Sequence, residues 1–166
     1  MKIVWDLDGV IRDLNGYIVT KYGGKYPTTW SYLCGNGKNI YETINDDLDI
    51  LIDSPPTAYC KVVTDHYWKP EIWTSQPEAW RDNTMKWVIK HLGEHCIVRF
   101  LKCEEKEARL RMEEDTILVE DSPNFKDYDR ILLIDRPYNQ NVHDVARIYG
   151  TKHLNNMIGL VQGMKG

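Results

Sequence analysis

Short apolar runs of strand length recur along the chain, and segments with helical periodicity lie between most of them. The runs cover residues 2–6, 71–74, 96–101, 116–120 and 130–135. Several of them are apolar almost throughout, which is typical of strands buried on both faces of a parallel sheet. The alternation predicts a doubly wound α/β fold, with a parallel sheet of about five strands flanked by helices.

One long segment interrupts this rhythm. Residues 13–67 lie between the first two runs and contain several turn signals, namely Gly23-Gly24, Pro27, Gly35-Asn36-Gly37 and Pro55-Pro56. Between these turns we expect helices near residues 14–22, 38–51 and 57–67. The segment is therefore interpreted as a small, mainly helical insert, and residues 1–12 and 68–166 as the α/β core.

The insert is rich in aromatic residues, and two interpretations of them stay open. They can fill the small core of the insert itself. Alternatively, two or three of them face the strand ends and stack on a planar part of a substrate, since aromatic side chains commonly line ligand pockets. The candidates for such contacts are Trp30, Tyr32 and Tyr41.

The bulk properties narrow the classes of protein that fit. A chain of 166 residues favours one domain with a small appendage, and its four cysteines form no CxxC pair, so we expect reduced thiols and a cytoplasmic protein. No apolar run approaches the ~20 residues of a membrane-spanning helix, and no signal peptide is recognisable. The net charge of −4 argues against a nucleic-acid polymer as partner, but not against a single nucleotide held by a metal. The oligomeric state stays open, a homodimer included.

Two acidic residues stand at the end of the first apolar run. Asp6 and Asp8 follow Lys2-Ile3-Val4-Trp5, and Gly9 then allows a sharp turn. Residues i and i+2 of an extended chain project to the same side, so both carboxylates are expected near one point. Buried carboxylates are costly for folding alone. The pair therefore points to a bound cation or to catalysis, and a helix cap or a turn acid is the alternative interpretation.

These acids belong to a set of motifs that resembles a known superfamily. The set comprises Asp6-Leu7-Asp8-Gly9-Val10, Thr74-Ser75 after the second run, a downstream lysine, and Val119-Glu120-Asp121-Ser122. In order and spacing it resembles the four motifs of the haloacid dehalogenase-like (HAD) hydrolases. The resemblance implies a HAD-like Rossmannoid core, with the insert as a small helical cap.

Three further segments are similar to the 5'(3')-deoxyribonucleotidase group of that superfamily and its phage and bacterial relatives. They are Ile40-Tyr41-Glu42 with the downstream Pro55-Pro56, residues 72–77, and Asp135-Arg136-Pro137-Tyr138-Asn139. This similarity implies a phosphate monoester, and more narrowly a nucleoside monophosphate, as substrate.

The resemblance assigns separate roles to the acids. Asp6 would attack phosphorus and form an aspartyl phosphate, while Asp8 would act as general acid and then as general base. A carboxylate approaching a phosphate dianion is repelled, so the site needs positive charge, and hard oxygen ligands suggest Mg²⁺. Asp6, Glu120 and Asp121 would hold the ion, together with the backbone carbonyl of Asp8.

The remaining motif residues would bind the phosphate or shape the site. Thr74 would hydrogen-bond the phosphoryl oxygens, and Ser75 either shares this role or caps the next helix. The phosphate lysine is Lys106 or Lys102, although the acidic run around Lys106 would also suit a solvated helix face. Arg136 follows the last strand and is either part of the site rim or an exposed arginine on a rigid loop.

The resulting hypothesis is a Mg²⁺-dependent phosphatase that acts through an aspartyl phosphate on (deoxy)ribonucleoside monophosphates. A phosphatase for sugar phosphates or for polynucleotide 3'-phosphate ends is an alternative of the same class. A non-catalytic binding protein on a hydrolase fold is an alternative of another class, and it predicts a damaged motif. All four motifs of this chain keep usable residues.

Overall fold

The computed structural model describes residues 1–163 and contains a six-stranded, all-parallel sheet in the order β3-β2-β1-β4-β5-β6. The predicted α/β class and parallel sheet are confirmed, but the expected number of about five strands was one too few. The strands are β1 (Lys2–Trp5), β2 (Glu71–Thr74), β3 (Ile97–Phe100), β4 (Thr116–Glu120), β5 (Ile131–Ile134) and β6 (Ala146–Ile148). The missed strand, β6, is three residues long at the sheet edge, and only its last residue is buried. It therefore lacks an apolar run.

The strand order places a topological switch point at the centre of the sheet. From β1 the chain crosses to β2 and β3 on one side, and it later returns to β4 on the other side of β1. Crossovers that leave in opposite directions open a crevice at the carboxyl ends of the two central strands. These ends are Trp5 and Glu120, directly before Asp6 and Asp121.

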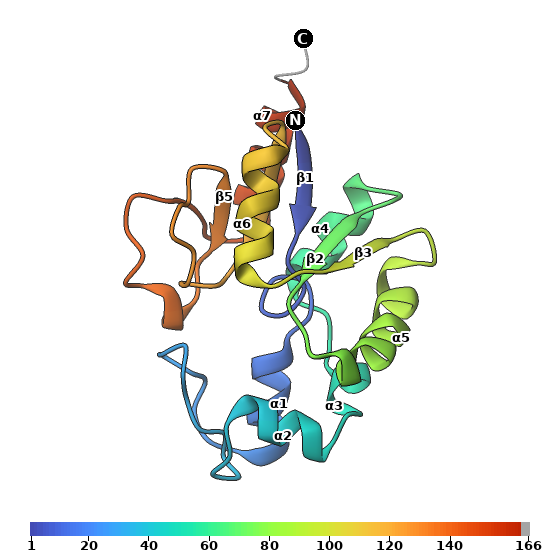
Figure 1. Ribbon diagram of the computed structural model, residues 1–166, viewed down its shortest axis with the longest axis vertical. Helices are drawn as coiled ribbons and strands as arrows, with labels where there is room; N and C mark the ends of the chain where they lie inside the picture. The colour runs from blue at the N-terminus through green and yellow to red at the C-terminus, as the bar shows by residue number, and fades with distance from the viewer. Residues whose placement is uncertain (164–166) are drawn as a thin grey trace.

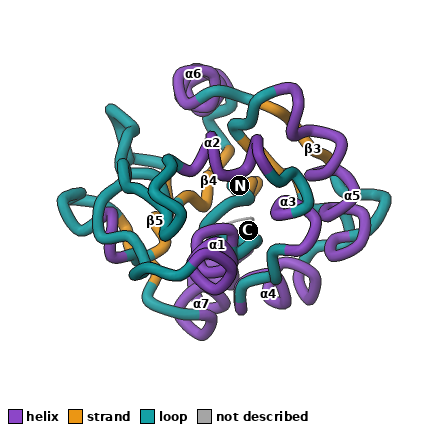
Figure 2. The backbone as a smooth tube through the Cα atoms, turned by 90° about the horizontal axis from the view of Figure 1, so that it is seen from below, coloured by secondary structure: helices purple, strands orange, loops and turns teal. Residues whose placement is uncertain are grey.

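Helices cover both faces of the sheet (Figure 2). One face packs against α4 (Ala58–His66), α5 (Arg81–Leu92) and α7 (Thr151–Gly163), and the other packs against α6 (Cys103–Met112). The short 3₁₀ turn η1 (Glu78–Trp80) directly precedes α5, whose buried residues include Thr84, Trp87, Val88 and Leu92. Within residues 1–163 no helix combines the length and apolarity needed to cross a membrane.

The insert packs as a separate small layer beyond the carboxyl ends of the strands (Figure 1). It contains α1 (Leu14–Tyr22), α2 (Ile40–Asp46) and α3 (Ile50–Asp53), so the single helix expected over residues 38–51 is two helices. Its own core combines apolar residues of these helices with Cys34 and with Trp80 of η1. The buried side chains of α4, by contrast, belong to the main core. The separately packed part therefore ends before α4, short of the boundary drawn at residue 67.

The turn after β1 is held closely against the rest of the site. Gly9 adopts a positive φ of 85°, and a Cβ there would lie 1.8 Å from Oδ2 of Asp121. A side chain at this position is therefore excluded by both conformation and space. The start and end of the insert are tied together nearby, since Asp13 N donates to the Pro55 carbonyl at 2.8 Å and Thr57 N to the Ile11 carbonyl at 2.7 Å.

Candidate active site

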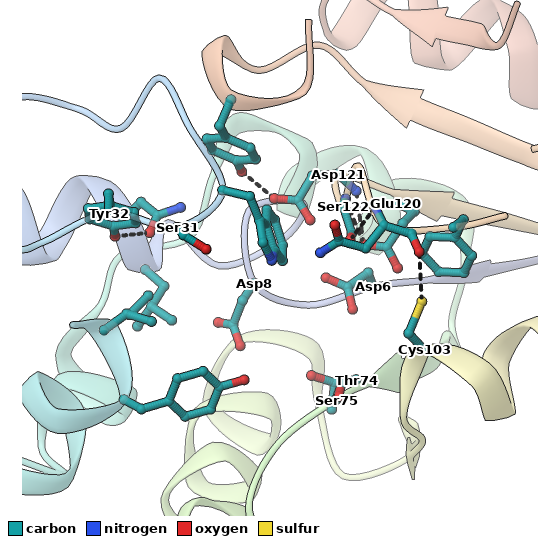
Figure 3. Close-up of a pocket in the computed structure, with 18 of the residues that line it drawn as sticks. Asp6, Asp8, Ser31, Tyr32, Thr74, Ser75, Cys103, Glu120, Asp121 and Ser122 are labelled. Atoms are coloured by element: carbon teal, nitrogen blue, oxygen red, sulfur yellow. Dashed lines mark hydrogen bonds between the residues drawn. The ribbon is translucent and has the colours of Figure 1, made fainter. Parts of the chain in front are cut away.

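A cavity of about 530 Å³ lies between the strand ends and the insert (Figure 3). Its volume is within the range of small-molecule sites. Residues that follow three of the central strands line one side, and residues of the insert line the other. The predicted site residues on the core side are Asp6, Asp8, Thr74, Ser75, Lys106, Glu120 and Asp121.

Three carboxylates form a buried cluster at this wall of the cavity. Asp6 follows β1, Glu120 ends β4 and Asp121 comes next, and one ligand oxygen from each lies within 4.8 Å of the others. All three side chains are buried. Glu120 is held in place by the backbone, because its Oε1 accepts hydrogen bonds from Asp121 N at 3.0 Å and Ser122 N at 3.1 Å.

Lys106 inserts its ammonium into the acidic cluster. Its Nζ donates to Asp6 Oδ1 at 2.6 Å and to Glu120 Oε2 at 2.8 Å, and the side chain is buried. Lys102, the other candidate for the phosphate lysine, is exposed at the start of α6 and does not line the cavity. One helical turn separates the two, and only Lys106 points toward the strand ends.

With all three carboxyl groups ionised, the acidic cluster would carry more negative than positive charge. Burial and the charge of Glu120 raise the pKa of Asp6 to about 8, against the opposing effect of Lys106. Burial, Glu120 and Asp6 also raise the pKa of Asp121. Although burial disfavours the charged form of Lys106, the charges of Asp6 and Glu120 raise its pKa. One ammonium thus faces three carboxylates.

This excess of charge fits a divalent cation. Two uncompensated negative charges in a buried site are costly, and a cation between them removes that cost while restoring the ionised form of each carboxyl. The donor set consists of carboxylate oxygens only, which is the chemistry that Mg²⁺ prefers. Asp6, Glu120 and Asp121 are the residues that would hold the ion.

Thr74 and Ser75 border the same cavity from the end of β2. The Thr74 side chain is buried, whereas Ser75 is exposed. The next helical segment begins three residues later at Glu78, after Pro77, and no hydrogen bond from Ser75 caps it. The capping interpretation of Ser75 is therefore wrong, and its hydroxyl lies at the cavity wall.

Asp8 lies outside the acidic cluster. Its carboxylate pairs with Arg12, at 2.6 Å from Oδ1 to Nε and 3.0 Å from Oδ2 to Nη2. Gln76 Nε2 also donates to Oδ2, at 2.9 Å. Sequence reasoning missed Arg12, although a charged residue directly after Val10-Ile11 could have drawn attention to it. Its side chain is fully buried.

The insert contributes an aromatic wall. Trp30, Tyr32 and Tyr41 all line the cavity, as the sequence interpretation requires. Trp30 contacts Tyr138 edge to face at 5.6 Å between ring centroids, and Tyr41 packs on Trp80 at 5.3 Å. Tyr32 both lines the cavity and packs against the core of the insert, so it fits both interpretations of the aromatic residues.

Two residues after β5, Tyr138 and Arg136, differ in their position relative to the cavity. Tyr138 was not singled out from the sequence, yet it lines the cavity and its hydroxyl donates to Asp121 Oδ2. Arg136 does not line the cavity. Its Nε and Nη2 donate to the Gly9 carbonyl at 3.0 and 2.7 Å, so it supports the turn after β1 from behind.

Compared with models of protein families and with curated proteins, the chain matches none of them. The chemistry of the site is therefore inferred from its residues. A carboxylate, an ammonium, two hydroxyls and a cluster of oxygen donors converge on one end of a cavity. Such a set suits the binding of an anionic group and its attack by a carboxylate.

Proposed function

We propose that this chain is a Mg²⁺-dependent phosphatase of the HAD type that hydrolyses small phosphate monoesters. One observation carries the proposal. Asp6 directly follows the central strand β1 at the cavity, and it shares Lys106 with Glu120 inside a cluster of three carboxyl groups. A phosphate dianion and an attacking carboxylate could meet at this point only with added positive charge, which Lys106 supplies in part.

In the first step an Asp6 oxygen would attack phosphorus, and the bond from phosphorus to the alcohol oxygen would break. Lys106 and Thr74 lie where they can offset the charge of the phosphoryl oxygens and orient them. Mg²⁺ bound by Asp6, Glu120 and Asp121 would supply the remaining positive charge. Asp8 would protonate the departing alkoxide, which is a poor leaving group without a proton.

In the second step water would cleave the aspartyl phosphate, and Asp8 would take the proton from that water. Asp8 borders the cavity and keeps part of its side chain exposed. It is therefore accessible to both the leaving group and the water. The cleaved phosphate would leave with the bond to Asp6 broken and the carboxylate restored.

A nucleoside monophosphate is the proposed substrate class. The cavity combines the proposed phosphate-binding end with the aromatic wall of Trp30, Tyr32 and Tyr41, which suits a planar base. Its apolar lining favours a nucleotide over a sugar phosphate. A net charge of −4 disfavours a polynucleotide end.

The proposal is tested by phosphate release from a panel of substrates with Mg²⁺ or with EDTA. The panel comprises deoxyribonucleoside and ribonucleoside 5'-monophosphates, sugar phosphates and a 3'-phosphorylated oligonucleotide. We expect Mg²⁺-dependent release with preference for a nucleoside monophosphate. Preference for another member of the panel would correct the substrate class. Folded protein that releases no phosphate from any of them would support the non-catalytic alternative.

A further inference from the structure

Arg12 is an arginine whose guanidinium has every hydrogen-bond donor occupied. Its five N–H groups match five contacts within 3.3 Å. Two go to the Asp8 carboxylate, one goes to the Leu51 carbonyl of α3 at 2.8 Å, and two go to Thr84 Oγ1 of α5. The guanidinium also lies over the Trp87 ring, 5.6 Å from its centroid. A side chain held in this way has one orientation.

Gln76 closes these contacts into a ring. Thr84 Oγ1 donates to Gln76 Oε1 at 2.6 Å, and Gln76 Nε2 donates to Asp8 Oδ2 at 2.9 Å. The ring therefore runs from Asp8 through Arg12, Thr84 and Gln76 back to Asp8. It joins the turn after β1 to the segment after β2 and to α5.

The two carboxylate oxygens of Asp8 accept different numbers of hydrogen bonds in this ring. A carboxylate offers about four acceptor positions, two on each oxygen. Oδ2 accepts from both Arg12 Nη2 and Gln76 Nε2, whereas within residues 1–163 Oδ1 accepts only from Arg12 Nε. Oδ1 thus keeps the free lone pair that a proton transfer needs.

We infer that Arg12, together with Gln76, is a positioning residue that presents Oδ1 of Asp8 to the leaving group and to the attacking water. The inference rests on the proposed function. Through its contact with the Leu51 carbonyl, the same arginine ties the position of Asp8 to α3 of the insert. The insert thereby contributes to proton transfer as well as to the aromatic wall.

The test separates proton transfer from general damage by means of the leaving group. An alkoxide needs a proton as it leaves, whereas p-nitrophenolate does not, and kcat/KM covers the steps up to phosphoryl transfer. We expect Arg12→Lys to lower kcat/KM for a nucleoside 5'-monophosphate by about 10–100-fold, and for p-nitrophenyl phosphate by less than about threefold. In the Asp8→Asn background the same change should add less than about twofold, because it acts through Asp8.

Two controls keep the result interpretable. Arg109→Lys alters an arginine that pairs with Glu113 away from the cavity, and it should leave both substrates unaffected. If Arg12→Lys fails to fold, as judged by its thermal transition, Gln76→Leu removes the other donor to Asp8 and should show the same dependence on leaving group.

Three outcomes would overturn the inference. They are an equal loss on both substrates, a loss confined to KM, and a loss that persists in the Asp8→Asn background. Any of them in an active wild-type enzyme refutes the positioning role alone. A folded wild-type protein that hydrolyses neither substrate with Mg²⁺ refutes the proposed function, and the inference with it.

Discussion

The two sides of the candidate active site handle buried charge in opposite ways. On one side, Asp6, Glu120 and Asp121 surround a single ammonium, that of Lys106. On the other side, one carboxylate meets one guanidinium within a closed ring of hydrogen bonds. On the first side, the carboxylates need a further cation to balance their charge. On the second side, the charge of Asp8 is balanced by Arg12.

This difference separates the proposed roles of the two motif acids. Asp6 sits where positive charge is missing, which is where a phosphate and a metal ion would have to bind together. Asp8 is paired with Arg12 and lies outside the acidic cluster, so its side chain is not among those that would hold a metal ion. The i, i+2 spacing brings the two acids to one cavity, while the turn at Gly9 gives them different surroundings.

The largest effect is expected on the side with excess negative charge. Asp6→Asn removes the proposed nucleophile and should lower kcat by about 10⁴-fold or more, as removal of a nucleophile does in other enzymes. Phosphate release under saturating substrate measures it. Asp65→Asn, in an exposed pair with Lys61, is the matched control and should keep full activity. A variant at Asp6 with near wild-type turnover would refute covalent catalysis.

Asp8→Asn should have a smaller and more selective effect. Loss of a general acid and base typically costs about 10²–10⁴-fold, and we expect kcat to fall by that amount for an alkyl phosphate. The affinity for Mg²⁺ should stay unchanged, because the Asp8 side chain lies outside the acidic cluster. Isothermal titration with Mg²⁺ checks this, and a loss of binding would mean that the two sides are not separate.

Mg²⁺ itself should stabilise the fold. At about 100 times its dissociation constant, a ligand that binds only the native state adds ~2.7 kcal/mol, which raises Tm by several degrees for a chain of this length. Thermal unfolding with Mg²⁺ and with EDTA measures the shift. Asp121→Asn should abolish most of it, whereas Asp8→Asn should preserve it. Equal shifts in both variants would contradict the assignment of the acidic cluster.

Glu71, at the opposite end of β2 from the cavity, is a buried carboxylate that pairs with two cations, Lys2 and Arg99. Burial alone would raise its pKa, but hydrogen bonds from Lys2, Trp73 and Arg99 lower the pKa to about 2. Its contribution to stability is therefore complete above pH 4.5 and disappears as the pH falls toward 2. Glu71→Gln should lower the unfolding free energy at pH 7 by about 1–2 kcal/mol and flatten that pH dependence. Urea unfolding across this pH range checks it, with the exposed Glu94→Gln as control.

The core side of the fold could be predicted because its signals are local. Apolar runs locate buried strands, and parallel strands bring their carboxyl ends to one edge, which is where Asp6, Thr74 and Glu120 lie. Choosing Lys106 over Lys102 needed the helical phase of α6, which follows once the helix start is known. β6 was not predicted because a short edge strand needs no apolar run.

The other side depends on contacts between distant segments, which periodicity does not report. Arg12 meets Leu51 and Thr84, which are 39 and 72 positions away in the sequence. Tyr138 reaches Asp121 across 17 positions, from the short 3₁₀ helix η2 (Pro137–Asn139) that follows β5. In the insert, the sequence pattern predicted helices but left open which aromatic side chains face the cavity.

The central claim is that Asp6 becomes phosphorylated, and trapping this state tests it most directly. An aspartyl phosphate is an acyl phosphate, so borohydride reduces it to homoserine, which peptide mass spectrometry locates. Protein quenched during turnover with Mg²⁺ and a nucleoside monophosphate should contain homoserine at position 6, and protein without substrate should not. Rapid phosphate release with an unmodified Asp6 throughout, or with modification at another carboxylate, would contradict the account.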